Sequence, residues 1–340
     1  MSDAELSYGS IEDYLGPAAT RFFGRGFRRV THHVTDLTVD PFDLKRGTHA
    51  KVTIEYPADW SKKGKLDLPP HLSTVDMLLL GAELSEVHLA HACGLDESAR
   101  NRMWLRKVIL KAGNEPQEDL TDLDGTATLV RTAPVPDRPG IHESVYATSI
   151  GAMSARCFIQ HPEGAPAGVA GGRYATVDDV LGAGESRYFG DGFKGRSQRI
   201  DDVRIDMSNL TGSASVRLDE EGDGGPPTRG MEGAWQPSAS LVDCFVVDLQ
   251  LAQILMYELD SIRRQDSHTL WMLKTTLEAP APDRPYDGPL GTTVAVTGKH
   301  LLPLRGATWR NVDVTGECAG ISLRCSFAHQ LPTTASARAS

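Results

Sequence analysis

The sequence predicts an α+β protein built from two similar units, and three observations lead to this prediction. The segments His71–Ala92 and Ser240–Asp260 have the length and apolar content of buried helices. Each is followed by segments with the period-two alternation of β-strands. The two halves of the chain also align with each other. One buried helix among antiparallel strands, present twice, indicates a tandem (double) hotdog fold, with two antiparallel sheets each wrapped around a long central helix. An α+β pseudo-dimer of another kind is the alternative.

Composition narrows the class of protein. The chain has 340 residues, 40% of them hydrophobic and 24% charged, which is the make-up of a soluble globular protein. A net charge of −10 with scattered Lys and Arg argues against binding to nucleic acid or to a membrane surface. No secretory signal or membrane-spanning run is recognisable, and the cysteines form no CxxC pair. We therefore expect a reduced, cytoplasmic protein.

The internal alignment keeps nearly the same offset along the chain. Arg21 in RFFG aligns with Arg187 in RYFG, 166 residues later. In the predicted helices, Asp76 aligns with Asp243 at an offset of 167, and near the ends of the two copies the offset is 168. Such constancy indicates a tandem duplication of one unit.

Each unit is predicted to contain the same elements in the same order. A short leader helix with an aromatic turn comes first, then two strands, a polar loop, the long helix and three strand segments, the last long enough for two strands. The expected domains are residues 1–160 and 176–330, with a Pro- and Gly-rich linker at 161–175 and a disordered tail at 331–340. The predicted strand segments are 30–39, 50–56, 103–110, 126–132 and 143–159, then 200–205, 213–218, 268–278, 292–301 and 307–327.

The long helices carry carboxylates, which a buried helix must pair or use. Ser73 and Thr74 are N-cap candidates for the first helix. Asp76 and Asp243 occupy the same first-turn position in the two helices. They either complement the helix dipole or act as general bases that orient water or a hydroxyl group, and the sequence leaves both interpretations open.

Other polar residues differ between the two copies. His71, just before the first helix, has Ser238 as its counterpart. A histidine present in only one half is expected if only one of the two pseudo-equivalent sites is active. The alternative is that His71 is a solvated loop residue. Two glutamates of the first helix become glutamines in the second, and these side chains either contact substrate or pack between the helices. The residues are Glu83 and Glu86 against Gln250 and Gln253.

The remaining motifs point away from metal and cofactor chemistry. Arg21 and Arg187 recur in both halves and either brace the structure or bind a phosphate or carboxylate. His88 and His91 lack a third ligand at a sensible spacing, so no metal is expected. The chain has no P-loop, no dinucleotide-binding glycine pattern and no GxSxG motif, so no cofactor is expected.

At RFFGRGFRRVT, YPADWSKKG and HLSTVDMLLLGAELSEV the sequence resembles the avirulence D protein family. The resemblance runs over the whole length, including SLVDCFVVDLQLAQILMYELD. It implies a role in making syringolides, small acyl-sugar elicitors, by joining a 3-oxoacyl thioester to a ketose. That reaction is similar to the one of A-factor synthase-type hotdog enzymes, which join a 3-oxoacyl carrier-protein thioester to dihydroxyacetone phosphate in making butyrolactone signals. No catalytic residue is carried over from the family.

The stretch from His71 to Asp76 also resembles the HPxLLD segment of polyketide dehydratases, which are double hotdogs. The match is partial, because Leu72 stands where that pattern has proline. In the dehydratases a His from one half works with an Asp from the other. This resemblance implies His71 and Asp243 as the first-choice pair.

These observations favour an acyltransferase or condensing enzyme for a signalling metabolite. The donor would be an acyl carrier protein or coenzyme A thioester, the acceptor a small polyol or ketose, and the protein a monomer or homodimer. A dehydratase or cyclase acting on a β-hydroxy- or β-ketoacyl thioester is one alternative, and a non-catalytic acyl-binding protein is another. The expected catalytic residues are His71, Asp243 and Asp76, and the expected substrate-binding residues are Glu83, Glu86, Gln250, Gln253, Arg21 and Arg187.

Overall fold

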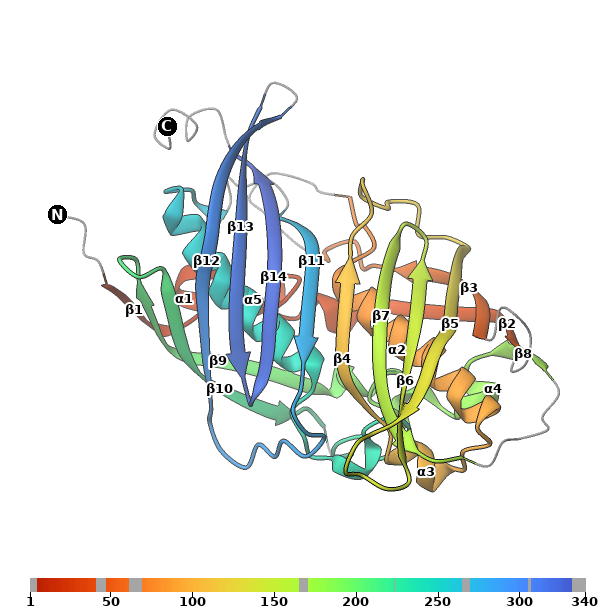
Figure 1. Cartoon of the computed structure of the whole chain (residues 1–340). Coiled ribbons are helices and arrows are strands. Elements are labelled where there is room, and N and C mark those ends of the chain that lie inside the picture. Colours follow the sequence, from red (N-terminus) through yellow and green to blue (C-terminus); the bar gives the residue numbers. More distant parts are fainter. Residues whose placement is uncertain are drawn as a thin grey trace.

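The chain forms an antiparallel sheet that curves around two long helices in a computed structural model (Figure 1). The structure describes residues 5–40, 47–60, 69–164, 171–222, 224–264, 270–304 and 307–331. The first half contains β1 (Glu5–Ser10), α1 (Glu12–Leu15), η1 (Ala18–Thr20), η2 (Gly26–Arg29), β2 (Thr31–Asp40), β3 (Gly47–Glu55), α2 (Thr74–Ala92), α3 (Glu97–Asn101), β4 (Trp104–Lys111), β5 (Leu123–Pro134), β6 (Ile141–Ile150) and β7 (Met153–Pro162). The second contains β8 (Gly172–Thr176), α4 (Asp178–Leu181), η3 (Gly184–Ser186), η4 (Gly192–Gly195), β9 (Arg196–Asp206), β10 (Thr211–Glu220), η5 (Gly233–Trp235), α5 (Leu241–Leu259), β11 (Trp271–Glu278), β12 (Leu290–Leu304), β13 (Ala307–Cys318) and β14 (Ile321–Gln330).

The strands form one sheet, whereas two separate sheets were expected. Its order is β1-β9-β10-β12-β13-β14-β11-β4-β7-β6-β5-β3-β2-β8, with 14 strands in the described part of the chain. β11 joins the halves by pairing antiparallel to β4, from Lys274 opposite Lys111 to Glu278 opposite Lys107. Glu278 also accepts hydrogen bonds from Arg106 and Lys107. The two edges that separate sheets would have left open satisfy each other here.

The two long helices occupy the concave side of this sheet. α2 contacts β2 to β7, and α5 contacts β9 to β14. Each begins with a capping box, in which the N-cap serine accepts from the backbone of the first-turn aspartate and the aspartate accepts from the backbone of the serine. Ser73 and Asp76 cap α2, and Ser240 and Asp243 cap α5. The N-cap predicted at Ser73 and the first-turn position of both aspartates are therefore confirmed.

The leader segments are exchanged between the halves. β1 pairs with β9, and α1 packs on α5, where Tyr14 donates a 2.6 Å hydrogen bond to Glu258. In the opposite direction, β8 pairs with β2 and α4 packs on α2. Each half therefore covers an edge and a helix of the other half.

The exchange involves strands in two segments for which none was expected. The segment 161–175, expected as a linker, contains the end of β7 and most of β8. Neither β1 nor β8 was predicted as a strand. Every segment that was predicted as a strand contains one in the structure, and the two long segments, 143–159 and 307–327, each contain two. Leu331 of the expected tail is buried, while residues 332–340, like 268 and 269 of the strand predicted at 268–278, lie outside the described residues.

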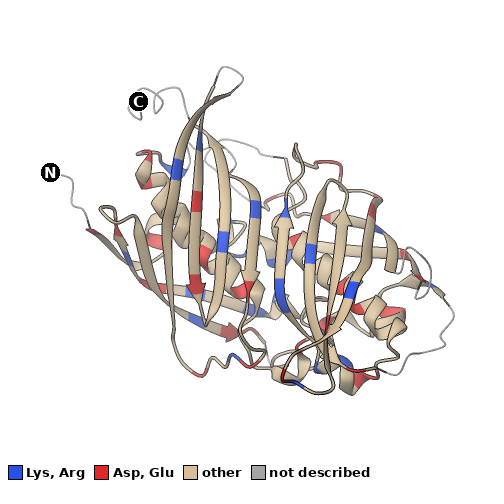
Figure 2. Ribbon diagram, viewed as in Figure 1, with Lys and Arg blue, Asp and Glu red and all other residues tan. Residues whose placement is uncertain are grey.

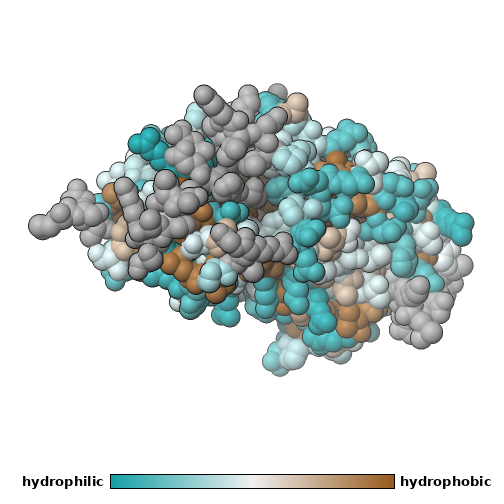
Figure 3. All heavy atoms as spheres, turned by 90° about the horizontal axis from the view of Figure 1, so that it is seen from above, coloured by the Kyte–Doolittle hydropathy of each residue, from teal (hydrophilic) through white to brown (hydrophobic). Residues whose placement is uncertain are grey.

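Basic and acidic residues alternate along the ribbon of both halves (Figure 2). On the face seen from above, hydrophobic residues form small groups among hydrophilic ones (Figure 3). Neither α2 nor α5, nor any shorter helix in the described ranges, has the length and apolar character that a membrane span requires.

Candidate active site between the two halves

A cavity of about 120 Å³ lies where the halves meet, at the N-terminus of α2. A water molecule needs roughly 10–15 Å³ on the same measure, so the cavity has room for a small molecule. One wall is apolar and aromatic, and it comes from the leader turn, the segment after β3, α5, the start of β11 and β14. Its lining includes Phe22, Phe23, Trp60, Leu249, Leu270, Trp271, Met272 and Phe327. The polar lining consists of Arg21, His71, Ser73, Thr74, Glu115, Gln117, Gln250, Gln253 and Arg264.

Arg21 reaches this cavity from the leader turn of the first half. The residue is only 4% exposed, and its guanidinium Nη1 donates a hydrogen bond to Gln250 Oε1 on α5. The carboxylate of Glu12 lies 4.0 Å from its Nη2. Burial lowers the pKa of Arg21 to about 10, Glu12 partly opposes this, and the neighbouring charge of Arg264 lowers the pKa further.

His71 lies at the start of α2, beside Ser73 and Thr74 in the cavity wall. Its imidazole ring meets the indole ring of Trp60 edge-on, with centroids 5.7 Å apart. The first free N–H groups of a helix and its positive dipole end make this position suitable for stabilising a developing negative charge. A proton-transfer group and a potential oxyanion site are therefore adjacent.

Asp76 lies in the first turn of α2, three residues after the N-cap Ser73. Its Oδ1 lies 2.8 Å from His32 Nε2, and its Oδ2 accepts from the Tyr56 hydroxyl and from Ser73. Burial would raise the pKa of Asp76, but the hydrogen bonds from His32, Tyr56 and Ser73 outweigh it, and the pKa is lowered. Asp76 is 1% exposed and does not line the cavity.

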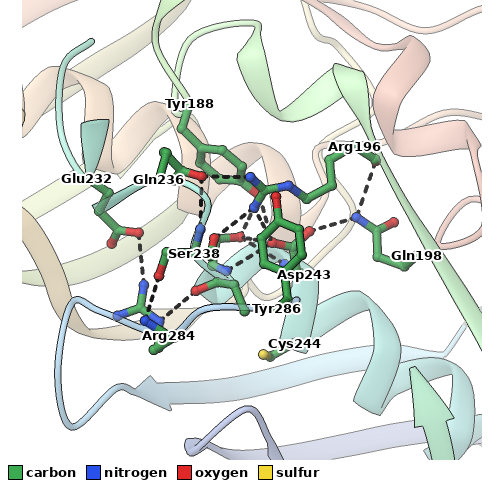
Figure 4. A network of polar contacts seen from close by, with 12 residues as sticks. Tyr188, Arg196, Gln198, Glu232, Gln236, Ser238, Asp243, Cys244, Arg284 and Tyr286 are labelled. Atoms are coloured by element: carbon green, nitrogen blue, oxygen red, sulfur yellow. Dashed lines mark hydrogen bonds and ion pairs between the residues drawn. The ribbon is translucent and has the colours of Figure 1, made fainter. Parts of the chain in front are cut away.

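Asp243 lies in a separate polar network at the start of α5 (Figure 4). Its carboxylate accepts from Arg196 at 3.1 Å and from Gln198 at 2.8 Å. The guanidinium of Arg196 stacks between the rings of Tyr188 and Tyr286. Gln250, which lines the cavity, is seven residues further along α5, about 10 Å along the helix axis. The structure thus places Asp243 and His71 in different clusters.

Glu83 and Arg187 form the counterpart of Gln250 and Arg21. Arg187 Nη1 lies 2.8 Å from Glu83 Oε1, and its Nη2 lies 2.9 Å from Asp178. Burial would lower the pKa of Arg187, but Glu83 and Glu86 outweigh it, and the pKa is raised. This ion pair lines a second, more polar depression.

A segment of the second half, residues 230–232, occupies the position that corresponds to the cavity. The backbone N–H of Met231 donates to Glu86 Oε1 at 3.1 Å, and that of Leu105 donates to Glu232 at 3.2 Å. Glu86 and Leu105 are the counterparts of Gln253 and Met272 in the cavity wall. Glu232 is fully buried and lies 3.0 Å from Arg284 (Figure 4).

The expected site residues therefore fall into distinct groups. His71, Arg21, Gln250 and Gln253 come together in the cavity. Glu83, Glu86 and Arg187 lie at the corresponding position between the other leader turn and helix α2. Asp76 and Asp243 cap their helices. Two residues of the cavity were not expected from the sequence. Trp60 stands in the YPADW segment, and Arg264 belongs to no periodic pattern or motif.

His88 and the cysteines lie outside the cavity, and their contacts are those of residues that support the fold. His88 Nδ1 lies 2.7 Å from the Tyr146 hydroxyl. In the described ranges, no three His, Cys, Asp or Glu side chains gather as metal ligands would. All five cysteines are free thiols, and burial raises the pKa of Cys157 and Cys325 to about 12.

The sequence matches the family described as Pseudomonas avirulence D protein (AvrD) over residues 6–332. No curated protein matches the chain. A conserved protein with a hot dog fold from Alicyclobacillus acidocaldarius is similar at 9% identity, covering 92% of this chain and 99% of its own, with a TM-score of 0.36. The 12:0-ACP thioesterase from Umbellularia californica is 12% identical, covering 94% and 97%, with a TM-score of 0.35. The dehydratase domain of RzxB from Pseudomonas fluorescens is 13% identical, covering 84% and 95%, with a TM-score of 0.35.

Proposed function

The chain belongs to the avirulence D protein family, and from this premise we propose that it is an acyltransferase that joins a 3-oxoacyl thioester to a small polyol or ketose. We further propose that each half is one hotdog unit and that the reaction takes place in the cavity at the N-terminus of α2. The observation that carries the proposal is this cavity, where an aromatic wall suited to an acyl chain meets His71 and a helix N-terminus.

The proposed reaction begins with proton transfer. His71 accepts the proton of the acceptor hydroxyl as its oxygen attacks the thioester carbonyl carbon. The carbonyl oxygen takes up negative charge, which the positive end of α2 at Thr74 stabilises, because the Ser73 N–H already donates to Asp76. The C–S bond then breaks, and the leaving thiolate takes the proton back from His71. One C–O bond replaces one C–S bond, and the products are an ester and a free thiol.

The remaining cavity residues would bind and orient the substrates. Gln250 and Gln253 offer amide groups to the acceptor hydroxyls. The apolar wall at Trp60 and Trp271 would hold the acyl chain. Asp76 would act through Ser73, as a group that holds the start of α2 in place, and not as the base. The pair of His71 with Asp243, which a dehydratase would need, is not favoured because Asp243 is ion-paired with Arg196.

The test is turnover by the purified protein. A 3-oxoacyl thioester of coenzyme A, or of a carrier protein, is incubated with a ketose, and the ester is detected by mass spectrometry and the thiol by a colorimetric reagent. We expect His71→Gln to lose at least about a hundred-fold in turnover, the usual contribution of general base catalysis. The matched control is His300→Gln, an exposed histidine on β12.

Two results would contradict the proposal. One is thiol release without any ester or lactone product, which would indicate a thioesterase. The other is a rise in enoyl absorbance from a β-hydroxyacyl thioester, which would indicate a dehydratase. Equal turnover by His71→Gln and the wild type would remove His71 from the site.

A further inference from the structure

Arg21 is a buried charge whose surroundings are short of negative charge. Its hydrogen-bond partner, Gln250, is neutral. The nearby carboxylate of Glu12 is 4.0 Å away on a side chain that is 49% exposed, so solvent screens it. Arg21 Nε is buried and has no hydrogen-bond partner within the described ranges. A buried guanidinium in this state is costly unless a further anion reaches it.

At the corresponding position in the other half, Arg187 has carboxylate partners. Arg187 faces Glu83 where Arg21 faces Gln250, and a second carboxylate, Asp178, completes its pairing. The difference at this position is one carboxylate replaced by an amide. Arg21, which faces an amide, lines the cavity at the N-terminus of α2. Arg187 also lines a depression, but its carboxylate partners Glu83 and Asp178 line that depression with it. The missing negative charge therefore corresponds to a place that a ligand can reach.

A second guanidinium strengthens the positive character of this cavity. Arg264 also lines it, donates a 3.3 Å hydrogen bond to the carbonyl of Thr20, and is close enough to Arg21 to lower its pKa. Glu115, the carboxylate in the lining, is on an exposed residue.

We propose that Arg21, together with Arg264, binds an oxyanion, a phosphate or a carboxylate, carried by the acceptor molecule. This inference rests on the proposed function, because it assigns the anion to the acceptor in the cavity where His71 lies. The planar guanidinium presents a fork of N–H donors that matches either group. The acyl chain occupies the apolar wall, so the acceptor enters with its anionic end toward Arg21 and its hydroxyl toward His71.

Binding measured by isothermal titration calorimetry tests this without requiring turnover. The probes are ribulose 5-phosphate, ribonate and ribulose, which carry a phosphate, a carboxylate and neither. We expect at least one of the two anions to bind the wild type about ten-fold or more tightly than ribulose does, as a charge-assisted hydrogen bond provides. Arg21→Gln should remove this preference, and Arg21→Lys should retain part of it.

A second variant guards against loss of folding in Arg21→Gln. Gln250→Glu leaves Arg21 in place and supplies the carboxylate that Glu83 provides in the other half. We expect this variant to fold, as judged by cooperative thermal unfolding, and to lose the preference for the anionic probes. If both variants lose the preference for anions while Gln250→Glu still unfolds cooperatively, the loss comes from the changed charge and not from unfolding.

Three results would overturn the inference. The first is equal binding of all three probes to the wild type, and the second is an anion preference that survives in both variants. The third is Arg21-dependent binding of decanoate with no such dependence for the ribulose-type probes, which would assign the anion to an acyl chain. Failure of the proposed function looks different, because anion binding would persist while no ester forms with any acceptor.

Discussion

Arg187 Nη1 lies 2.8 Å from Glu83 Oε1, and this ion pair joins the leader turn of one half to the long helix of the other. Its counterpart in the first half joins Arg21 to Gln250, an amide. The corresponding position therefore holds a buried ion pair on one side. On the other side it holds an arginine that is hydrogen-bonded to an amide in a cavity, with the carboxylate of Glu12 4.0 Å away.

We expect Glu83→Gln to destabilise the protein by about 3 kcal/mol, the low end of the range for breaking a buried ion pair. The cost is at the low end because Asp178 still lies 2.9 Å from Arg187. Urea unfolding at neutral pH measures the change in the free energy of unfolding. The control is Asp178→Asn, whose carboxylate is 57% exposed and should cost under about 1 kcal/mol. Equal costs for both variants would contradict the buried-pair account.

A buried carboxyl group in α5 makes stability depend on pH. Asp248 accepts a 2.6 Å hydrogen bond from Thr292, and burial raises its pKa to about 8. The group is neutral in both states below pH of about 4, so its full contribution to stability is present there. As the pH rises toward 8 the unfolded chain ionises and the folded one does not, and stability is lost at up to about 1.4 kcal/mol per pH unit.

Asp248→Asn should remove this dependence. We expect the free energy of unfolding of the variant, relative to the wild type, to increase steadily between pH 4 and pH 8, as measured by urea unfolding at several pH values. The control is Asp313→Asn on β13, where the aspartate is exposed. A difference between variant and wild type that stays constant over this range would mean that Asp248 is ionised in the folded protein.

The predictable parts of this structure are those that local residues determine. The capping boxes follow from a serine three residues before an aspartate. The long helices follow from apolar runs that only Gly81 interrupts in α2 and that no Gly or Pro interrupts in α5. The strands of each half follow from alternation. Of the nine expected site residues, four line the cavity: Arg21, His71, Gln250 and Gln253.

The features that sequence reasoning missed depend on contacts between distant segments. Asp248 is one example, since its counterpart in α2 is Gly81. A Cβ on Gly81 would lie 3.0 Å from Thr148 Oγ1, and one on Gly316, the counterpart of Thr148, would lie 2.5 Å from Asp248 Oδ2. The bulky residue is on the strand in one half and on the helix in the other. Such an exchange of bulk is seen only when the contact between helix and strand is known. The same holds for the pairing of β1 and β8 with strands of the opposite half.

His32, which contacts Asp76, can be compared directly with its counterpart in the other half. His32 and Gln198 occupy corresponding positions, and both lie 2.8 Å from the capping aspartate of their own half. We therefore expect His32→Gln to be tolerated, while His32→Ala leaves a buried carboxylate short of a donor and costs about 1–3 kcal/mol. Thermal unfolding of both variants at pH 7 measures this. Similar losses for both would indicate that packing, not hydrogen bonding, is what His32 contributes.

The pH dependence of this site has the opposite sign to that of Asp248. The pKa of Asp76 is lowered in the folded protein, so its contribution is present above pH of about 4 and is lost as the pH falls below that value. We expect His32→Ala to weaken this dependence, because one of the hydrogen bonds that lower the pKa is removed. Acid unfolding followed by circular dichroism should then begin at a higher pH in His32→Ala than in His32→Gln.

The exchanged leader segments predict that neither half folds alone. A chain of residues 1–168 would lack β8, which covers β2, and β11, which covers β4, so both edges of its part of the sheet would be open. It would also lack Arg187, leaving Glu83 on α2 without its partner. The complementary chain 169–340 would lack β1 on the edge of β9.

We expect each fragment alone to aggregate or to unfold without cooperativity, and the two expressed together to form a 1:1 complex with a sheet content like that of the intact chain. Size-exclusion chromatography with light scattering and far-ultraviolet circular dichroism measure both properties. A fragment 1–168 that is monomeric and unfolds cooperatively would mean that the sheet edges and the Arg187–Glu83 pair add little, and that the halves are independent domains that merely touch.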